Sequence, residues 1–283
     1  MSDLKIFTEN IEPEALNQIY TLVKQPAFAD CKVRIMPDVH AGTGCVIGFT
    51  ADLGDKVIPN IVGVDIGCGM LTVELGKEEI CLETVDDIIR RYVPSGRNVH
   101  EGRQVQFDEI KELCCFRELK DTKRLERSIG TLGGGNHFIE IDIDKRGVKY
   151  LIIHTGSRNL GKQVAEYYQN LAIEIMQGKD KLFEMQEKLI TNYKAQGRKK
   201  EIQSAIKELH RQFNPNPLGI PKELCYLTGK YREDYLHDMK ICQQFASINR
   251  YEIANAIIGI SSKRLRNFLS KFVRRFRNER RTF

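Results

Sequence analysis

Four short, polar, glycine-rich segments hold the side chains of this sequence that are best suited to chemistry. They contain three of the six histidines, one of the eight cysteines and two aspartates. The segments are PDVHAGTG (37–44), GVDIGCGM (63–70), TLGGGNHFIE (131–140) and HTGSRNLG (154–161). Loops at strand ends commonly carry binding and catalytic residues, so this clustering is the main functional signal in the sequence.

Asp65 and Cys68 combine a carboxylate and a thiol within one tight segment, where Gly67 lets the backbone turn sharply. These two ligand types could begin a transition-metal site, which the imidazoles of His137 and His154 would complete. The alternative is that each histidine is a hydrogen-bonded structural residue and that Cys68 is a small buried apolar residue. The residue types alone leave both interpretations open, and the mixed ligand set does not fix the metal.

The run of glycines at 133–135 would let backbone amides approach an anion closely. It is not a Walker loop, because no Gly-Lys-Ser/Thr follows it, and a tight turn between two strands is the alternative. In HTGSR, Ser157 and Arg158 could bind a phosphate, the arginine through two parallel hydrogen bonds. The alternative for Arg158 is an ordinary surface residue.

The elements that must position these residues follow from the pattern of apolar side chains. Runs rich in β-branched residues, separated by glycine-rich turns, predict strands. They are CKVRIM (31–36), CVIGFTADL (45–53), KVIPNIVGV (56–64), MLTVEL (70–75), HFIEIDID (137–144) and KYLIIHT (149–155). Apolar spacings of three and four predict helices. These cover 83–93, 161–212 with Gly197 between two helices, and 231–257, and FNPNPLGIP (213–221) breaks the pattern. We therefore predict an α+β protein, in which a mixed β-sheet body carries a helical arm at about 161–212.

The composition excludes two broad classes of protein. With 41% hydrophobic residues among 283, the chain can bury a core and is not disordered. No apolar run approaches the ~20 residues of a membrane-spanning helix, and the stretch 253–260 is only eight residues long. The N-terminus has no signal-peptide pattern, and eight cysteines in a chain of this length do not resemble a disulfide framework. We expect a reduced, cytoplasmic protein.

The positive charge is concentrated at the C-terminal end. Residues 261–283 contain nine Lys/Arg and one acid (9 − 1 = +8), whereas the other 260 residues hold 35 bases and 37 acids, a net −2. Apolar residues spaced three and four apart predict a basic amphipathic tail after an α+β portion at 1–260. The tail could be an anchor to RNA or a membrane surface, or a helix that covers exposed core. It could also result from a frameshift or cut after about residue 258.

The segments MPDVHAGTGCVIG, GVDIGCGM, GTLGGGNHFIE and HTGSRNLG, in this order, resemble the RtcB-type RNA ligase family. The stretch DYLHDM…FASINR (234–250) resembles the helix that follows them in that family. The resemblance covers roughly residues 30–250 and rests on long, unusual motifs.

The resemblance implies a GTP- and Mn²⁺-dependent ligase that joins an RNA 3′-phosphate or 2′,3′-cyclic phosphate to a 5′-hydroxyl, in tRNA splicing and RNA repair. It implies two manganese ions, RNA as the partner and an archease-type activator. By motif, the metal ligands would be Asp65, Cys68, His137 and His154. Asn136, Phe138 and Glu140 would lie against the guanine nucleotide, and Arg158 would hold an RNA or nucleotide phosphate.

Several motifs of the family that follow the matched helix are not found in this sequence. They are an HN-type motif with a further metal-ligand histidine, an RKGA-like segment, the HGAGR-like motif and a lysine near the C-terminus. The family's guanylylated histidine belongs to an HGAGR-like motif beyond the matched helix, and no histidine follows Arg250 here. The surroundings of His100, His210 and His237 do not resemble those of the nucleophile, and for His237 we expect a solvent-facing or capping role. The catalytic residue is therefore unknown. The alternative function is an inactive metal- and nucleotide-binding fragment of a truncated ligase.

Overall fold

A computed structural model of the chain describes residues 3–261. Its elements form two compact units, each built from two stretches of the chain. Within the described residues, the first unit comprises 3–63 and 165–235, and the second comprises 64–164 and 236–261. All but the first residue of the predicted basic tail, 261–283, lies outside the described residues.

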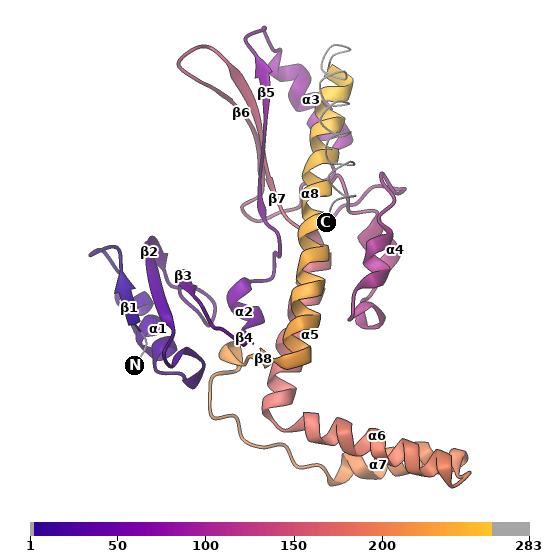
Figure 1. The fold of residues 1–283 in the computed structure, drawn as a ribbon. Coiled ribbons are helices and arrows are strands. Elements are labelled where there is room, and N and C mark those ends of the chain that lie inside the picture. The colour runs from indigo at the N-terminus through magenta and orange to yellow at the C-terminus, as the bar shows by residue number, and fades with distance from the viewer. Residues whose placement is uncertain (1–2, 262–283) are drawn as a thin grey trace. The chain divides into compact units, whose positions relative to one another are not determined.

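The first unit contains a mixed three-stranded sheet in the order β1-β2-β3 (Figure 1). Strand β1 (Asp3–Ile6) pairs parallel with β2 (Lys32–His40), which pairs antiparallel with β3 (Ile47–Ala51). Helix α1 (Pro13–Val23) packs against β2, and the 3-10 turn η1 (Pro26–Phe28) follows it. The apolar side chains between them are fully or almost fully buried and include Ile19, Leu22, Phe28, Val33 and Ile35. Their burial is the main stabilising contribution to this unit.

The predicted strand at 56–64 is wrong beyond its first residues. Strand β4 (Lys56–Val57) is short and pairs antiparallel with β8 (Leu227–Thr228), and the short helix α2 (Pro59–Val62) follows β4. Pro59 explains the change, because proline donates no hydrogen bond to a sheet and fits the first turn of a helix.

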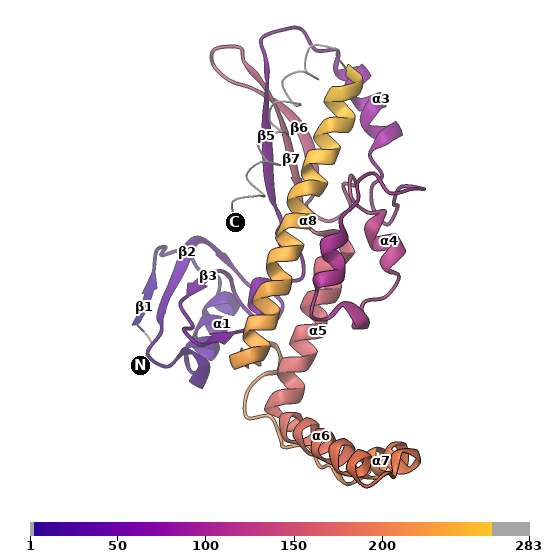
Figure 2. The same ribbon diagram turned by 45° about the vertical axis from the view of Figure 1, so that its right-hand side comes forward.

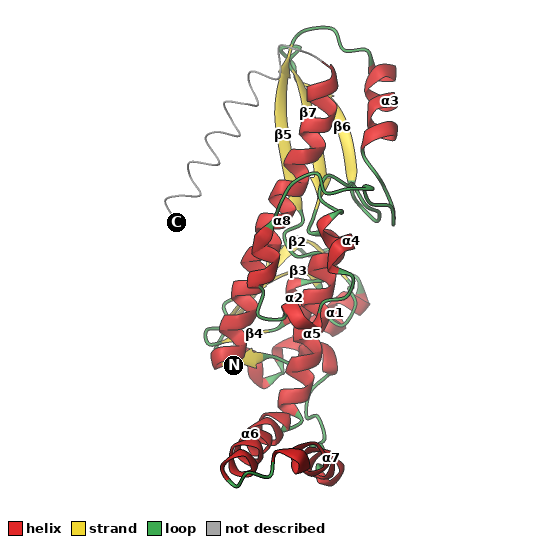
Figure 3. Cartoon of the chain, turned by 90° about the vertical axis from the view of Figure 1, so that its right-hand side faces the viewer, coloured by secondary structure: helices red, strands yellow, loops and turns green. Residues whose placement is uncertain are grey.

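Two helices of the first unit form an antiparallel pair in the region predicted to be a helical arm. Helices α6 (Lys179–Ala195) and α7 (Ile202–Gln212) pack side by side, with the 3-10 turn η4 (Lys199–Glu201) before α7 (Figure 3). The predicted break at Gly197 is confirmed, since this glycine has φ 73° between the two helices. The proline-rich segment 213–221 forms neither helix nor strand, as predicted, and η5 (Lys222–Leu224) follows it.

The second unit is built on an antiparallel sheet in the order β5-β7-β6. Its strands are β5 (Gly69–Gly76), β6 (Phe138–Ile143) and β7 (Lys149–Thr155), each within one or two residues of the predicted run at both ends. Helix α3 (Leu82–Tyr92) and the C-terminal half of α8 (Gly229–Ser261) share a hydrophobic core with the sheet (Figure 2). The buried core between them includes Val73, Val85, Leu151, Ile153, Ile253 and Ile257. The sheet therefore has one face in the core and can present the alternate residues of its strands on the other.

Short helices complete the second unit before β6. They are η2 (Asp108–Glu112), η3 (Phe116–Glu118) and α4 (Thr122–Glu126), and helix α5 (Arg158–Met176) begins after β7. The predicted α+β class is confirmed, as is the helix expected at 231–257. Among the described residues, none of the helices has both the length and the apolar character needed to cross a membrane.

Candidate metal centre

The antiparallel register of the second unit brings three strand ends to one place. Strand β5 begins just after Cys68, β6 begins just after His137, and β7 carries His154 one residue before its end. His154 pairs with Met70 on one side and with Phe138 on the other. Cys68 and His154, which are 86 positions apart in the chain, are therefore neighbours at one end of the sheet.

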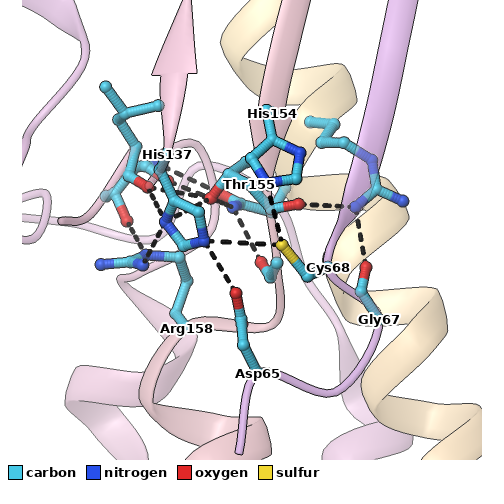
Figure 4. A network of polar contacts seen from close by, with 12 residues as sticks. Asp65, Gly67, Cys68, His137, His154, Thr155 and Arg158 are labelled. Carbon is cyan, nitrogen blue, oxygen red and sulfur yellow. Dashed lines mark hydrogen bonds and ion pairs between the residues drawn. The ribbon is translucent and has the colours of Figure 1, made fainter. Parts of the chain in front are cut away.

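Four side chains predicted to bind a metal meet at this end of the sheet (Figure 4): Asp65, Cys68, His137 and His154. The Cys68 Sγ atom lies 3.4 Å from His154 Nε2 and 3.8 Å from His137 Nε2. His137 Nε2 lies 2.7 Å from Asp65 Oδ2, and the ligand atoms of Asp65, Cys68 and His137 all lie within 4.8 Å of one another. Because the Cys68 sulfur lies within 3.8 Å of both imidazoles, these three side chains could all contribute ligands to one metal site.

The hydrogen bonds of His137 test whether this donor set fits a cation. Its Nδ1 atom lies 2.9 Å from the carbonyl oxygen of Leu132, an acceptor that requires a hydrogen on Nδ1. A neutral ring then carries its lone pair on Nε2, which faces the Asp65 carboxylate and the Cys68 sulfur. Several lone pairs that converge at this distance require a proton or a metal ion between them, so the residues fit a metal.

The pKa values of the Asp65 and Cys68 side chains are shifted in opposite directions by their surroundings. Burial raises the pKa of Asp65, but its contacts with His137 and Cys68 more than offset this effect, so the pKa lies below its usual value. Burial, followed by the hydrogen bond and negative charge of Asp65, raises the pKa of the Cys68 thiol to about 11. A coordinated metal ion would replace the thiol proton, because metals bind cysteine as the thiolate.

Arg158 extends the site on the other side of His137. It is the first residue of α5 and has a left-handed backbone conformation with φ 59°, which is uncommon for a residue other than glycine. Its guanidinium donates to Thr131 Oγ1 at 3.2 Å and to the Gly96 carbonyl at 3.3 Å. One of its nitrogens also lies 3.4 Å from His137 Nδ1. Burial lowers the pKa of Arg158, and the charge of Asp65 opposes this shift. The structure thus places the predicted phosphate-binding cation beside the predicted metal ligands.

Two glycines make room for these charged groups. A Cβ atom at Gly156 would overlap the Asp65 carboxylate, and one at Gly133 would overlap the Arg158 guanidinium. Gly133 also has φ 85°, whereas the adjacent Gly134 has no left-handed backbone and an added Cβ there would only touch Gly96 at 3.9 Å. The predicted role of the glycine run as an anion cradle stays a prediction. The structure gives Gly133 a definite role in positioning Arg158.

Gly133→Ala should lower the free energy of unfolding by about 2 kcal/mol, from backbone strain together with displacement of Arg158. Gly134→Ala is the matched control and should change it by less than about 0.5 kcal/mol, as for an ordinary surface substitution. Urea denaturation followed by circular dichroism measures both values. Equal effects of the two substitutions would show that Gly133 has no special role.

The residues predicted to contact the nucleotide lie in the loop before β6 and on that strand. The Phe138 ring stacks on His154, with centroids 5.3 Å apart and planes inclined by 26°. Asn136 is exposed, and Glu140 is exposed on β6 opposite Ile152. Phe138 is therefore in direct contact with the candidate centre. The nucleotide-binding roles of all three residues stay predictions.

Asn249 on α8 is a structural residue of the site to which the sequence reasoning assigned no role. It is fully buried, and its Oδ1 accepts hydrogen bonds from the backbone amides of Gly130 and Thr131 at 2.8 and 3.0 Å. Its Nδ2 donates to the carbonyls of Thr131 and Gly156, each at 3.1 Å. One side chain thereby joins the loop that leads to His137 and the loop that follows His154.

Arg250 has a related role beside it. One of its guanidinium nitrogens donates to the Gly67 carbonyl at 2.9 Å and to the Thr155 carbonyl at 2.7 Å, which ties the Asp65–Cys68 turn to the end of β7. A signal for Asn249 was present in the sequence: it lies four residues from both Phe245 and Ile253, on the apolar stripe of the helix. A polar residue on a buried helix face requires hydrogen-bond partners.

Comparison with known proteins agrees with the motifs at this centre. The family model described as tRNA-splicing ligase RtcB matches residues 18–118 and 115–273. These matches include every residue of the candidate metal centre and most of the chain, and they extend past residue 250, where the motif resemblance ends. The fold and site define an α+β protein with a centre of one aspartate, one cysteine and two histidines at one end of a sheet. The chain belongs to the RtcB family.

Individual relatives are similar over part of their length. The chain is 29% identical to RNA-splicing ligase RtcB of Escherichia coli (strain K12), in an alignment that is 292 positions long with its gaps and covers 93% of this chain and 62% of that protein. It is 28% identical to tRNA-splicing ligase RtcB of Archaeoglobus fulgidus, over 54% of this chain and 43% of that protein. It is 31% identical to tRNA-splicing ligase RtcB of Nanoarchaeum equitans, over 48% and 40% respectively. The chain thus spans about three fifths of the length of the Escherichia coli relative, and a smaller share of the other two.

Proposed function

We propose that this chain supplies the metal-, nucleotide- and RNA-end-binding part of a GTP-dependent RNA ligase. The reaction would join an RNA 3′-phosphate or 2′,3′-cyclic phosphate to a 5′-hydroxyl, as in tRNA splicing or RNA repair. The observation that carries the proposal is the convergence of Asp65, Cys68, His137 and His154 beside Arg158. The names of the relatives, which are RNA- and tRNA-splicing ligases, support the substrate class.

Mn²⁺ is the metal that we propose for this centre. A bound divalent ion would neutralise phosphoryl charge and orient the reacting oxygens. Asp65, Cys68, His137 and His154 would hold it. The hydrogen bond between His137 Nδ1 and Leu132 fixes the ring so that Nε2 faces the ligand position, as outer-sphere hydrogen bonds commonly do for metal-binding histidines.

The remaining residues would bind the nucleotide and the RNA end. Arg158 would hold a phosphate through its guanidinium, a group that matches the geometry of phosphate oxygens and stays charged in proteins. Phe138 would offer an apolar surface next to His154. Asn136 and Glu140, both exposed, would supply hydrogen bonds to a guanine base.

A binding experiment tests the proposal. A short RNA with a 3′-phosphate should bind at least tenfold more tightly with Mn²⁺ than with EDTA, as measured by fluorescence anisotropy. The same RNA with a 3′-hydroxyl should show little dependence on the metal. Equal binding of the two RNAs under both conditions would contradict a role in recognising RNA 3′-phosphate ends.

A second candidate function is an inactive metal- and nucleotide-binding fragment. It is favoured by the contacts of three other histidines, which are engaged elsewhere. His100 Nε2 lies 3.0 Å from the Gly130 carbonyl, His210 Nε2 lies 2.8 Å from Gln186 Oε1, and His237 Nδ1 lies 3.1 Å from Asp238 Oδ1. Incubation with Mn²⁺ and GTP labelled at the α-phosphate distinguishes the two candidates. A covalent protein–GMP adduct would favour a role in the ligase reaction, and metal-dependent binding without an adduct would favour the inactive fragment.

A further inference from the structure

A second group of metal-ligand side chains lies in the second unit, apart from the candidate metal centre. Cys114 lies in the loop between η2 and η3, while His237 and Asp238 are adjacent residues of α8. The Cys114 Sγ atom is 3.9 Å from His237 Nδ1, which is 3.1 Å from Asp238 Oδ1. One ligand atom from each of the three residues lies within 4.8 Å of the other two.

The carboxylate of this group is held in place by the backbone of the loop. Asp238 is fully buried, and its two oxygens accept hydrogen bonds from the backbone amides of Cys114 at 2.8 Å and of Cys115 at 3.1 Å. These bonds fix the carboxylate next to the cysteine and hold the loop against α8. A buried carboxylate so placed gives the site a negative charge that favours a cation over a neutral ligand.

The distances between the three ligand atoms are close to those between neighbouring ligands of a tetrahedral metal site. For Zn–S and Zn–N bonds of about 2.3 and 2.0 Å, a tetrahedral site places sulfur and nitrogen roughly 3.5 Å apart. Nitrogen and oxygen ligands are then roughly 3.3 Å apart. The observed 3.9 and 3.1 Å differ from these values by a few tenths of an ångström, which small rotations of side chains would remove. Cysteine, histidine and aspartate are all established zinc ligand types.

The group is also accessible to an ion from solvent. Cys114 is exposed, and the His237 side chain is 49% exposed, whereas Asp238 forms the buried inner end. We propose that Cys114, His237 and Asp238 form a second metal site, selective for Zn²⁺ or a similar transition metal, with the fourth coordination position open to water. A bound ion would link the loop at 113–115 to the helix α8, so the site would stabilise this unit independently of the proposed RNA ligase function.

Titration with Co²⁺ tests this proposal, because Co²⁺ substitutes for Zn²⁺ and gives a thiolate charge-transfer absorption in the near ultraviolet. The full chain is used in a Cys68→Ser background, so that the candidate metal centre contributes no thiolate. We expect this variant to retain the absorption and Zn²⁺ to displace Co²⁺ from it. Adding Cys114→Ser should remove the absorption and weaken Zn²⁺ binding at least 100-fold, since it deletes a direct ligand.

Two further variants keep the result interpretable. Cys81→Ser in the same background is the matched control, because Cys81 is also exposed but its thiol contacts Glu83. His237→Gln should weaken Zn²⁺ binding as Cys114→Ser does, and circular dichroism establishes whether each variant is folded. Absorption that survives both Cys114→Ser and His237→Gln, or that is missing from the Cys68→Ser protein, would overturn the proposal.

Discussion

Replacing Cys68 with alanine should weaken Mn²⁺ binding at the candidate metal centre at least 100-fold. The Cys68 sulfur lies within 3.8 Å of the Nε2 atoms of both His137 and His154, so its removal deletes the donor atom that is next to both imidazoles. Loss of outer-sphere partners already weakens metal binding 10–100-fold, and loss of a direct ligand should have a larger effect. Electron paramagnetic resonance of free Mn²⁺ during titration measures the affinity.

Cys81→Ala provides the control for this prediction. Cys81 is an exposed cysteine of the same unit, and its thiol contacts Glu83 rather than a histidine. The variant should bind Mn²⁺ like the unmodified chain. If Cys68→Ala retained the full affinity, the cysteine would be a structural residue and the metal assignment would fail.

Asn249→Ala should lower the free energy of unfolding by about 3 kcal/mol or more. The substitution leaves the buried amides of Gly130 and Thr131 without their acceptor, and the carbonyls of Thr131 and Gly156 without a donor. Each buried polar group that loses its partner costs about 1–3 kcal/mol. Urea denaturation monitored by far-ultraviolet circular dichroism gives the free energy.

A second asparagine on the same helix separates this effect from helix propensity. Asn255 donates a single hydrogen bond to Glu252 at 3.3 Å and is only partly buried. Asn255→Ala should therefore change the free energy of unfolding by less than about 1 kcal/mol. Similar losses in the two variants would indicate that the Asn249 network contributes little.

Much of the second unit could be predicted from local patterns. The runs around Cys68, His137 and His154 carry the β-branched residues and turn glycines that define strands, and β7 occupies the predicted range. The ligand types of the candidate metal centre could also be predicted, because carboxylate, thiol and imidazole are recognisable from the residues alone. Local patterns predict where the strands lie in the sequence but not how they pair. The position of β7 between β5 and β6 depends on long-range contacts.

Features that depend on distant contacts could not be predicted from one sequence. Cys114 and His237 are 123 positions apart, and only the packing of a loop on α8 makes them neighbours. His237 was expected to face solvent or cap a helix, and its ring is half exposed but also contacts Asp238 and Cys114. The role of Gly133 likewise follows from the path of the Arg158 side chain, which no spacing within the loop reveals.

Metal-dependent GTP binding is the most direct test of the proposed function. Equilibrium dialysis with labelled GTP should show binding with Mn²⁺, none with EDTA, and at least a tenfold loss in Cys68→Ala with Mn²⁺ present. That result would place the nucleotide at the centre formed by Asp65, Cys68, His137 and His154. GTP binding that is as tight in EDTA, and in Cys68→Ala, as in the unmodified chain with Mn²⁺ would contradict a metal-dependent nucleotide site at this end of the sheet.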